Sequence, residues 1–97
     1  MRKLDKSGRI TIPRWYRKTF HLDKGSLVEI TIEKGSINIK PFKWENMQAK
    51  EFVGIVRRLD NGGRIVIPSE YLEILKFDVE NEYELVIQGE KLIIKKE

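Results

Sequence analysis

Residues 2–23 read RKLDKSGRITIPRWYRKTFHLD, and residues 57–78 read RRLDNGGRIVIPSEYLEILKFD. The two stretches align without a gap, and the alignment extends over residues 2–40 and 57–95. Fourteen of the 39 aligned pairs are identical, which is far more than two unrelated segments of this length would share. We therefore infer that the chain contains a duplicated unit, and a repeat of this kind decides the fold before any single element does.

Each unit predicts the same succession of short elements. A strand (residues 2–4 and 53–59) precedes a turn that contains Gly8 or Gly63, where a positive φ is freely available. A second strand (residues 9–12 and 64–67) leads to Pro13 or Pro68, which suits the first position of a short helix over residues 13–20 or 68–75.

A hairpin follows the helix in both units. Alternation of apolar and polar residues predicts one inward face per hairpin. The residues expected to face inward on the outgoing strands are Val28, Ile30 and Ile32 in the first unit and Tyr83, Leu85 and Ile87 in the second. Strand-rich units with one short helix each predict a mostly β fold, a small closed or nearly closed barrel that hides its strand edges.

The size of the unit requires pairing. Chains below about 40 residues rarely stabilise a core without disulfides, metals or a partner, and this chain has no cysteine. The two units must pair within one chain, or each must pair with its equivalent in a second chain as a homodimer. A connection of about 13 residues gives an effective concentration near millimolar, which favours pairing within the chain.

This organisation divides one barrel domain into residues 1–40, a linker at 41–53, and residues 54–97. Within the linker, Trp44, Met47 and Phe52 are expected to pack across the barrel as a hydrophobic plug. The alternative is that the linker is a segment that binds a partner.

Composition excludes most enzyme classes. The chain has 97 residues, no cysteine and one histidine, His21, so no thiolate or histidine cluster can hold a metal. It contains no nucleotide-binding or hydrolase motif, and we expect no enzyme activity, no cofactor and no small-molecule substrate. Apolar runs are too short to span a membrane, and the N-terminus lacks a secretory apolar region, so we expect a cytoplasmic protein.

The positive charge is concentrated in the first unit. The net charge is +4, and it divides into +6 over residues 1–40, zero over 41–53 and −2 over 54–97. A concentrated basic surface indicates an anionic partner, with nucleic acid the first candidate and a membrane surface the second.

The pattern Arg-[Lys/Arg]-Leu-Asp-x-x-Gly-Arg-Ile-x-Ile-Pro, followed by a short helix and a hairpin, resembles the SpoVT/AbrB family of swapped-hairpin transcription regulators. The resemblance implies that two units interleave their hairpins into one barrel. It also implies a basic face that binds double-stranded DNA at A/T-rich or deformable promoter sites, with a location at the nucleoid.

The family's DNA-contacting positions are carried over unit by unit. In the first unit they are Arg2, Lys3, Arg9, Arg17 and Lys18, with Arg14 beside them on the helix, and in the second they are Arg57, Arg58 and Arg64. Leu72 and Glu73 occupy the second unit's helix positions, so the resemblance predicts that the first unit contacts most of the DNA. His21 and Lys76 stand where the family usually has a helix-ending glycine.

Two alternatives accompany this interpretation. Arg9 and Arg64 could instead form ion pairs with Asp5 and Asp60 that hold the turns. The whole chain could instead be a protein-interaction module, antitoxin-like or anti-regulator, in which the acidic second helix contacts a protein and no DNA is bound.

Overall fold

The computed structural model describes residues 2–47 and 54–96. The first half of the chain comprises β1 (Arg2–Lys3), β2 (Arg9–Thr11), α1 (Arg14–Thr19), β3 (Leu27–Glu33) and β4 (Ser36–Pro41). The short helix α2 (Trp44–Met47) follows. The second half comprises β5 (Ile55–Arg58), β6 (Arg64–Val66), α3 (Ser69–Leu75), β7 (Glu82–Gln88) and β8 (Lys91–Lys96). Both halves therefore have the same order of elements.

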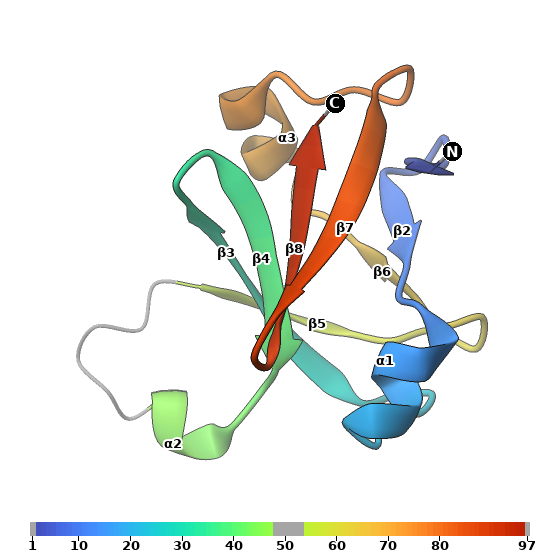
Figure 1. Ribbon diagram of the computed structural model, residues 1–97, viewed down its shortest axis with the longest axis vertical. Coiled ribbons are helices and arrows are strands. Elements are labelled where there is room, and N and C mark those ends of the chain that lie inside the picture. Colours follow the sequence, from blue (N-terminus) through green and yellow to red (C-terminus); the bar gives the residue numbers. More distant parts are fainter. Residues whose placement is uncertain (1, 48–53, 97) are drawn as a thin grey trace.

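The hairpins of the two halves lie side by side in one antiparallel sheet. The strand order is β1-β7-β8-β4-β3-β5, so the first hairpin (β3–β4) meets the second (β7–β8) along β4 and β8. Each half's first strand pairs with the hairpin of the other half, β1 with β7 and β5 with β3. Figure 1 shows the two hairpins crossing at the centre of the molecule. This exchange of strands is the swapped-hairpin arrangement expected from the sequence.

A two-stranded ribbon, β2 with β6, covers the other side of the barrel. Ile10 pairs with Ile65 at its centre. Beyond the ribbon, the Ile12 amide donates to the Gly63 carbonyl at 2.8 Å, and the Ile67 amide donates to the Gly8 carbonyl at 3.0 Å. The expected mostly β barrel with short helices is confirmed, and the structure pairs its two halves within one chain.

Both halves contribute to a single hydrophobic core. The buried apolar side chains are Leu4, Ile10, Ile12, Tyr16, Leu22, Val28, Ile30, Ile37, Ile39, Leu59, Ile65, Ile67, Phe77, Tyr83, Leu92 and Ile94. The prediction that Ile87 faces inward is wrong, because its side chain is 38% exposed. Ile87 lies next to the hairpin turn, where β8 pairs with one edge of β7, and β1 pairs with the other edge only at Tyr83 and Glu82.

The expected hydrophobic plug is not formed by Trp44. This side chain is 69% exposed and makes an edge contact with the Phe42 ring, with centroids 5.3 Å apart. Phe52 and the side chain of Met47 fall outside the described part of the chain. The prediction fails at Trp44 because core volume is already filled by side chains from the strands.

The helices begin and end in a way that the sequence only partly indicates. Pro13 and Pro68 have extended ψ angles of 141° and 133°, so each proline is the N-cap and the helix begins one residue later than expected. At the other ends, His21 and Lys76 have φ angles of 56° and 53°. Both therefore adopt the left-handed conformation that the family's usual glycine would adopt without strain.

Within residues 2–47 and 54–96, no helix has the length and apolar character needed to cross a bilayer. The same residues contain no group of three or more potential metal ligands.

Candidate nucleic-acid interface

Two equivalent turns position the central arginines of the ribbon. Asp5 Oδ1 accepts hydrogen bonds from the amides of Ser7 and Arg9, each at 2.9 Å, and Asp5 Oδ2 accepts from Arg9 Nε at 2.8 Å. The backbone amide of Arg9 is the first cause that holds the pKa of Asp5 below its ordinary value. The turn thus fixes both the backbone and the Arg9 side chain.

The second half repeats this network. Asp60 Oδ1 accepts from the amides of Gly62 and Arg64 at 2.8 and 2.9 Å, and Oδ2 accepts from Arg64 Nε at 3.0 Å. The backbone amide of Arg64 is the first cause that lowers the pKa of Asp60. Arg9 Nη1 also lies 3.7 Å from Asp60 Oδ2, which links the two turns across the ribbon. The ion pairs of the alternative interpretation are therefore present.

These ion pairs do not bury the arginines. The Arg9 and Arg64 side chains are 31% and 40% exposed, and each is anchored through its Nε atom. No hydrogen bond or ion pair from residues 2–47 and 54–96 engages the terminal amines of Arg64, so both can meet an outside acceptor in a direction fixed by the Nε contact. An arginine that is held in place loses less side-chain entropy when it binds a phosphate.

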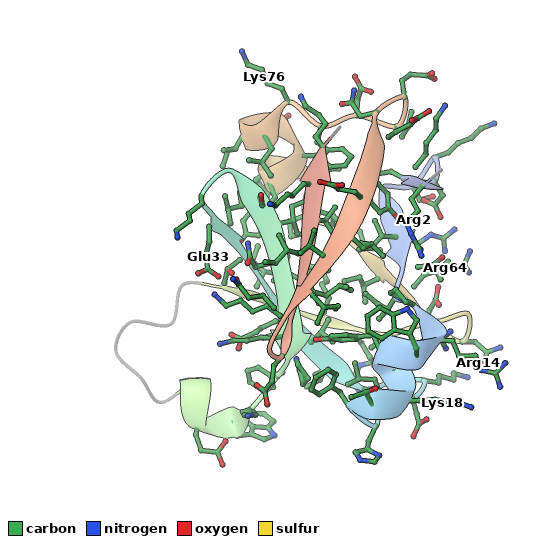
Figure 2. The ribbon with its side chains drawn as sticks, in the orientation of Figure 1. Arg2, Arg14, Lys18, Glu33, Arg64 and Lys76 are labelled. Carbon is green, nitrogen blue, oxygen red and sulfur yellow. The ribbon has the colours of Figure 1, made fainter. Side chains whose placement is uncertain are left out.

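The two arginines line a shallow groove of about 360 Å³ with the cations of β1. Arg2, Lys3, Arg9 and Arg64 surround it, together with Asp5, Thr11 and Tyr83. Arg2 and Lys3 are exposed, and neither forms a salt bridge within residues 2–47 and 54–96. Figure 2 places Arg2 and Arg64 on the same side of the barrel, where β2 and β6 run.

A second basic hollow, of about 350 Å³, lies on α1. Arg14, Arg17, Lys18 and His21 line it, with Leu22 and Asp23. Arg14 and Lys18 are exposed and stand one helical turn apart, so they share one face of the helix. Figure 2 shows both on the side of the molecule that carries Arg2 and Arg64.

Arg17 differs from its two neighbours on α1. It is half-buried, and its Nε donates to the Ile12 carbonyl at 3.0 Å. Its guanidinium lies against Gly63, close enough that a Cβ there would stand 2.5 Å from Arg17 Cζ. In the second half, Leu72 lies against Gly8 in the same way, with its Cδ1 3.5 Å from the position of a Cβ. Sequence reasoning missed this role, although the Arg17/Leu72 pairing in the aligned units was a signal for it.

In the second half, two of the predicted DNA-contacting arginines already donate hydrogen bonds to backbone carbonyls. Arg57 is half-buried and donates from Nη1 to the Val56 carbonyl at 3.2 Å. Arg58 is exposed and donates from Nη1 to the Gly25 carbonyl at 3.0 Å. In α3, which the structure describes completely, Ser69 and Glu73 align with Arg14 and Lys18, and the helix carries no cation. The structure thus brings Arg2, Lys3, Arg9, Arg64, Arg14 and Lys18 to one side and gives Arg17 a structural contact.

Two of the comparisons with known proteins each cover about half of the chain. Residues 1–44 match the family model described as antidote-toxin recognition MazE, bacterial antitoxin. A segment of 44 residues is 39% identical to the putative transition state regulator Abh of Bacillus subtilis (strain 168), and covers 45% of this chain and 48% of that protein. The chain thus spans about half the length of this relative.

A solved structure matches nearly the whole chain. The solution structure of PHS018 from Pyrococcus horikoshii superimposes with a TM-score of 0.54 and 20% identity, over 98% of this chain and 83% of that one. At this identity the likeness concerns the fold alone.

Neither the matched family nor the relative is named for an enzyme, which agrees with the sequence-based prediction that the chain is a non-enzymatic protein. The matched segment contains β1 to β4, α1 and the first of the two Asp–Arg turns. Together with the exchanged hairpins, this match agrees with the AbrB-type resemblance expected from the sequence, and residues 1–44 are similar to the MazE antitoxin family.

Proposed function

We propose that the chain is a transcription regulator that binds double-stranded DNA in the cytoplasm through the β2–β6 ribbon and α1. The observation that carries the proposal is the groove lined by Arg2, Lys3, Arg9 and Arg64, four cations from three strands on one exposed surface. Arg14 and Lys18 extend this surface along α1. The regulator named among the relatives supports the same function.

The two kinds of cation have different roles in this proposal. Arg2, Lys3, Arg14 and Lys18 neutralise phosphates and release counterions, which gives an affinity that falls steeply with salt. Arg9 and Arg64 are held rigidly by Asp5 and Asp60, so they reach the DNA with a fixed orientation. With no long recognition helix in the described residues, preference comes mainly from the shape and deformability of A/T-rich DNA.

The test is fluorescence anisotropy with an A/T-rich promoter duplex and a G/C-rich duplex across a salt series. Arg14→Ala/Lys18→Ala removes two exposed cations without touching the Arg17 contact. If both residues contact phosphates, the plot of log K against log salt should flatten by about two units. Affinity should fall similarly on both duplexes, because phosphate contacts carry no sequence information.

The matched control is Lys43→Ala/Lys91→Ala. It removes the same charge, but these lysines form exposed ion pairs with Glu90 and Glu33, and Figure 2 shows Glu33 on the side opposite Arg14. The control should leave the salt slope unchanged. Equal slopes for the two double variants, or no binding at low salt, would contradict the proposed interface.

A second candidate function is neutralisation of a protein partner in the manner of an antitoxin. The description of the family model matched by residues 1–44 favours it. The exposed Glu70 and Glu73 on α3 would then meet a basic partner surface. In this case Arg14→Ala/Lys18→Ala should leave partner binding unchanged while Glu70→Lys/Glu73→Lys abolishes it.

A further inference from the structure

The two halves differ in the contacts between each helix and the hairpins. These contacts are made by Tyr16 of α1 and by Tyr71 of α3. In the first half, the Tyr16 hydroxyl donates to the Glu90 carbonyl in the turn of the β7–β8 hairpin, and it lies 3.5 Å from the Ile39 carbonyl of β4. Phe20 packs beside it, with ring centroids 4.7 Å apart. Tyr16 is fully buried, and burial followed by the charge of Glu90 raises the pKa of its hydroxyl. Two packed aromatic side chains, Tyr16 and Phe20, therefore occupy this end of the barrel.

The equivalent position in the second half is open. Tyr71 aligns with Tyr16, but its hydroxyl donates to the Ile30 carbonyl at 3.2 Å, in the middle of β3. It does not reach Gly35 and Ile94, the residues that align with Glu90 and Ile39. Leu75 replaces Phe20, which removes an aromatic ring from the same place. A hollow of about 400 Å³ remains between the β3–β4 turn, the end of α3 and β8.

The lining of this hollow combines a small apolar wall, at Leu75, with a cationic rim. Phe77 and Ile94 are buried beneath it, and Leu75 is half-buried. The rim carries Lys34, Lys95 and Lys96. The aligned residues of the first half, Gly89, Lys40 and Pro41, include one lysine, and it is paired with Glu29 at 3.5 Å.

The rim lysines differ in the contacts that they make. Lys96 Nζ donates to the Lys76 carbonyl at 2.8 Å, which covers the C-terminal end of α3 and offsets its partial negative charge. Lys34 and Lys95 are exposed, and neither forms a salt bridge within residues 2–47 and 54–96. Lys95 is opposite Glu84 in the β7–β8 register without an ion pair between them. Two cations without an ion pair among the described residues thus flank the apolar wall at Leu75.

We propose that this hollow binds a small organic anion with an apolar body, of which a medium-chain carboxylate is the simplest example. Its volume lies in the range of small-ligand sites, about 300–1,000 Å³. The apolar body would lie against Leu75, above the buried Phe77 and Ile94, and the carboxylate would lie between Lys34 and Lys95. The site does not depend on DNA binding, because Figure 2 shows the α3 end, marked by Lys76, away from Arg14 and Lys18.

The test is a titration of the ¹⁵N-labelled full chain with sodium decanoate below its micelle concentration. Saturable shifts should be confined to residues 34–36, 75–77 and 94–96. Decyltrimethylammonium, which has the same alkyl chain and the opposite charge, should not produce them. The variant Lys34→Asn/Lys95→Gln should weaken decanoate binding about tenfold, as loss of charge-assisted contacts predicts.

The matched control is Lys6→Gln/Lys24→Gln, which removes the same charge from loops that do not line the hollow. It should bind decanoate as the unmodified chain does. Three results would overturn the proposal: shifts centred elsewhere on the barrel, equal binding of the two amphiphiles, or equal weakening by the two double variants. Each of these results can be obtained whether or not the chain binds DNA.

Discussion

The guanidinium of Arg17 packs against Gly63, a glycine in the turn of the opposite half of the chain. Gly63 is buried, has a φ of 75° and accepts a hydrogen bond from the Ile12 amide, while Arg17 Nε donates to the Ile12 carbonyl. Arg17, Ile12 and Gly63 therefore form a clamp between the halves. The equivalent clamp uses Leu72, Ile67 and Gly8, and is apolar where the first is charged.

The contact between Arg17 and Gly63 predicts that alanine substitutions at two equivalent glycines lower the free energy of unfolding by different amounts. Gly8→Ala should destabilise the fold by about 1–2 kcal/mol, because alanine is strained at a positive φ. Gly63→Ala should cost about 1 kcal/mol more, because its Cβ displaces Arg17 from the Ile12 carbonyl. Urea denaturation measures both. In an Arg17→Ala background the two substitutions should cost the same, and a difference that persists would show that Arg17 is not its cause.

The left-handed end of α3 predicts a stabilising substitution. Lys76 has a φ of 53°, a conformation that costs a side-chain-bearing residue about 1 kcal/mol relative to glycine. Lys76→Gly should therefore raise the free energy of unfolding by about 1 kcal/mol and raise Tm by roughly 4–8 °C for a domain of this size. The hydrogen bond from Lys96 Nζ to the backbone carbonyl of residue 76 is retained. Lys76→Ala, which removes the same charge, should give no gain, and an equal gain would point to charge rather than conformation.

The two turn aspartates predict acid sensitivity. The pKa values of Asp5 and Asp60 are lowered in the fold, first by backbone amides and also by Arg9 and Arg64. A carboxyl group with a lowered pKa contributes stability above its unfolded pKa, and the contribution is lost as pH falls through the folded value. The urea midpoint should therefore fall as pH drops below about 4, the ordinary pKa of an aspartate.

In Asp5→Asn/Asp60→Asn this dependence should become shallower. Asp23→Asn is the control, since the structure shows no hydrogen bond to the Asp23 carboxylate from the described residues. An unchanged pH dependence in the double variant would locate the acid-sensitive groups elsewhere.

Pairing of the halves within one chain predicts the mass in solution. We propose one barrel per chain, with residues 1–40 and 54–97 as its two units, because every strand pair between the halves is satisfied intramolecularly. Light scattering should give a mass near 11.5 kDa that does not change on dilution. A mass of twice that value would favour a homodimer that exchanges the same strands between two chains.

The sequence predicted the order of strands and helices because turn residues and apolar alternation are local signals. It predicted Ile30 and Tyr83 in the core for the same reason. It could not predict that Ile87 is exposed, since this depends on how far β1 runs along β7. It also assigned Arg17 wholly to DNA, because its contact with Gly63 joins residues that only the exchange of strands brings together.

The difference between α1 and α3 predicts a gain of DNA affinity. The two helices lie on either side of the β2–β6 ribbon (Figure 1), and α3 has Ser69 and Glu73 where α1 has Arg14 and Lys18. Ser69→Arg/Glu73→Lys should therefore strengthen binding and steepen the salt slope by about two units, because two more phosphates are neutralised. Ser69→Ala/Glu73→Ala separates the loss of the glutamate from the gain of cations.

Added charge alone must be distinguished from added contacts. Thr31→Arg/Glu33→Lys introduces the same change in charge on β3, and Figure 2 shows Glu33 on the side of the molecule opposite Arg14. This variant should raise the affinity slightly through long-range attraction, without the two-unit change in slope. If it steepens the slope as much as the α3 variant does, net charge governs binding and the ribbon with its flanking helices is not the contact surface. A steep slope for the α3 variant alone would place DNA across both halves, with the natural chain holding it mainly through the first.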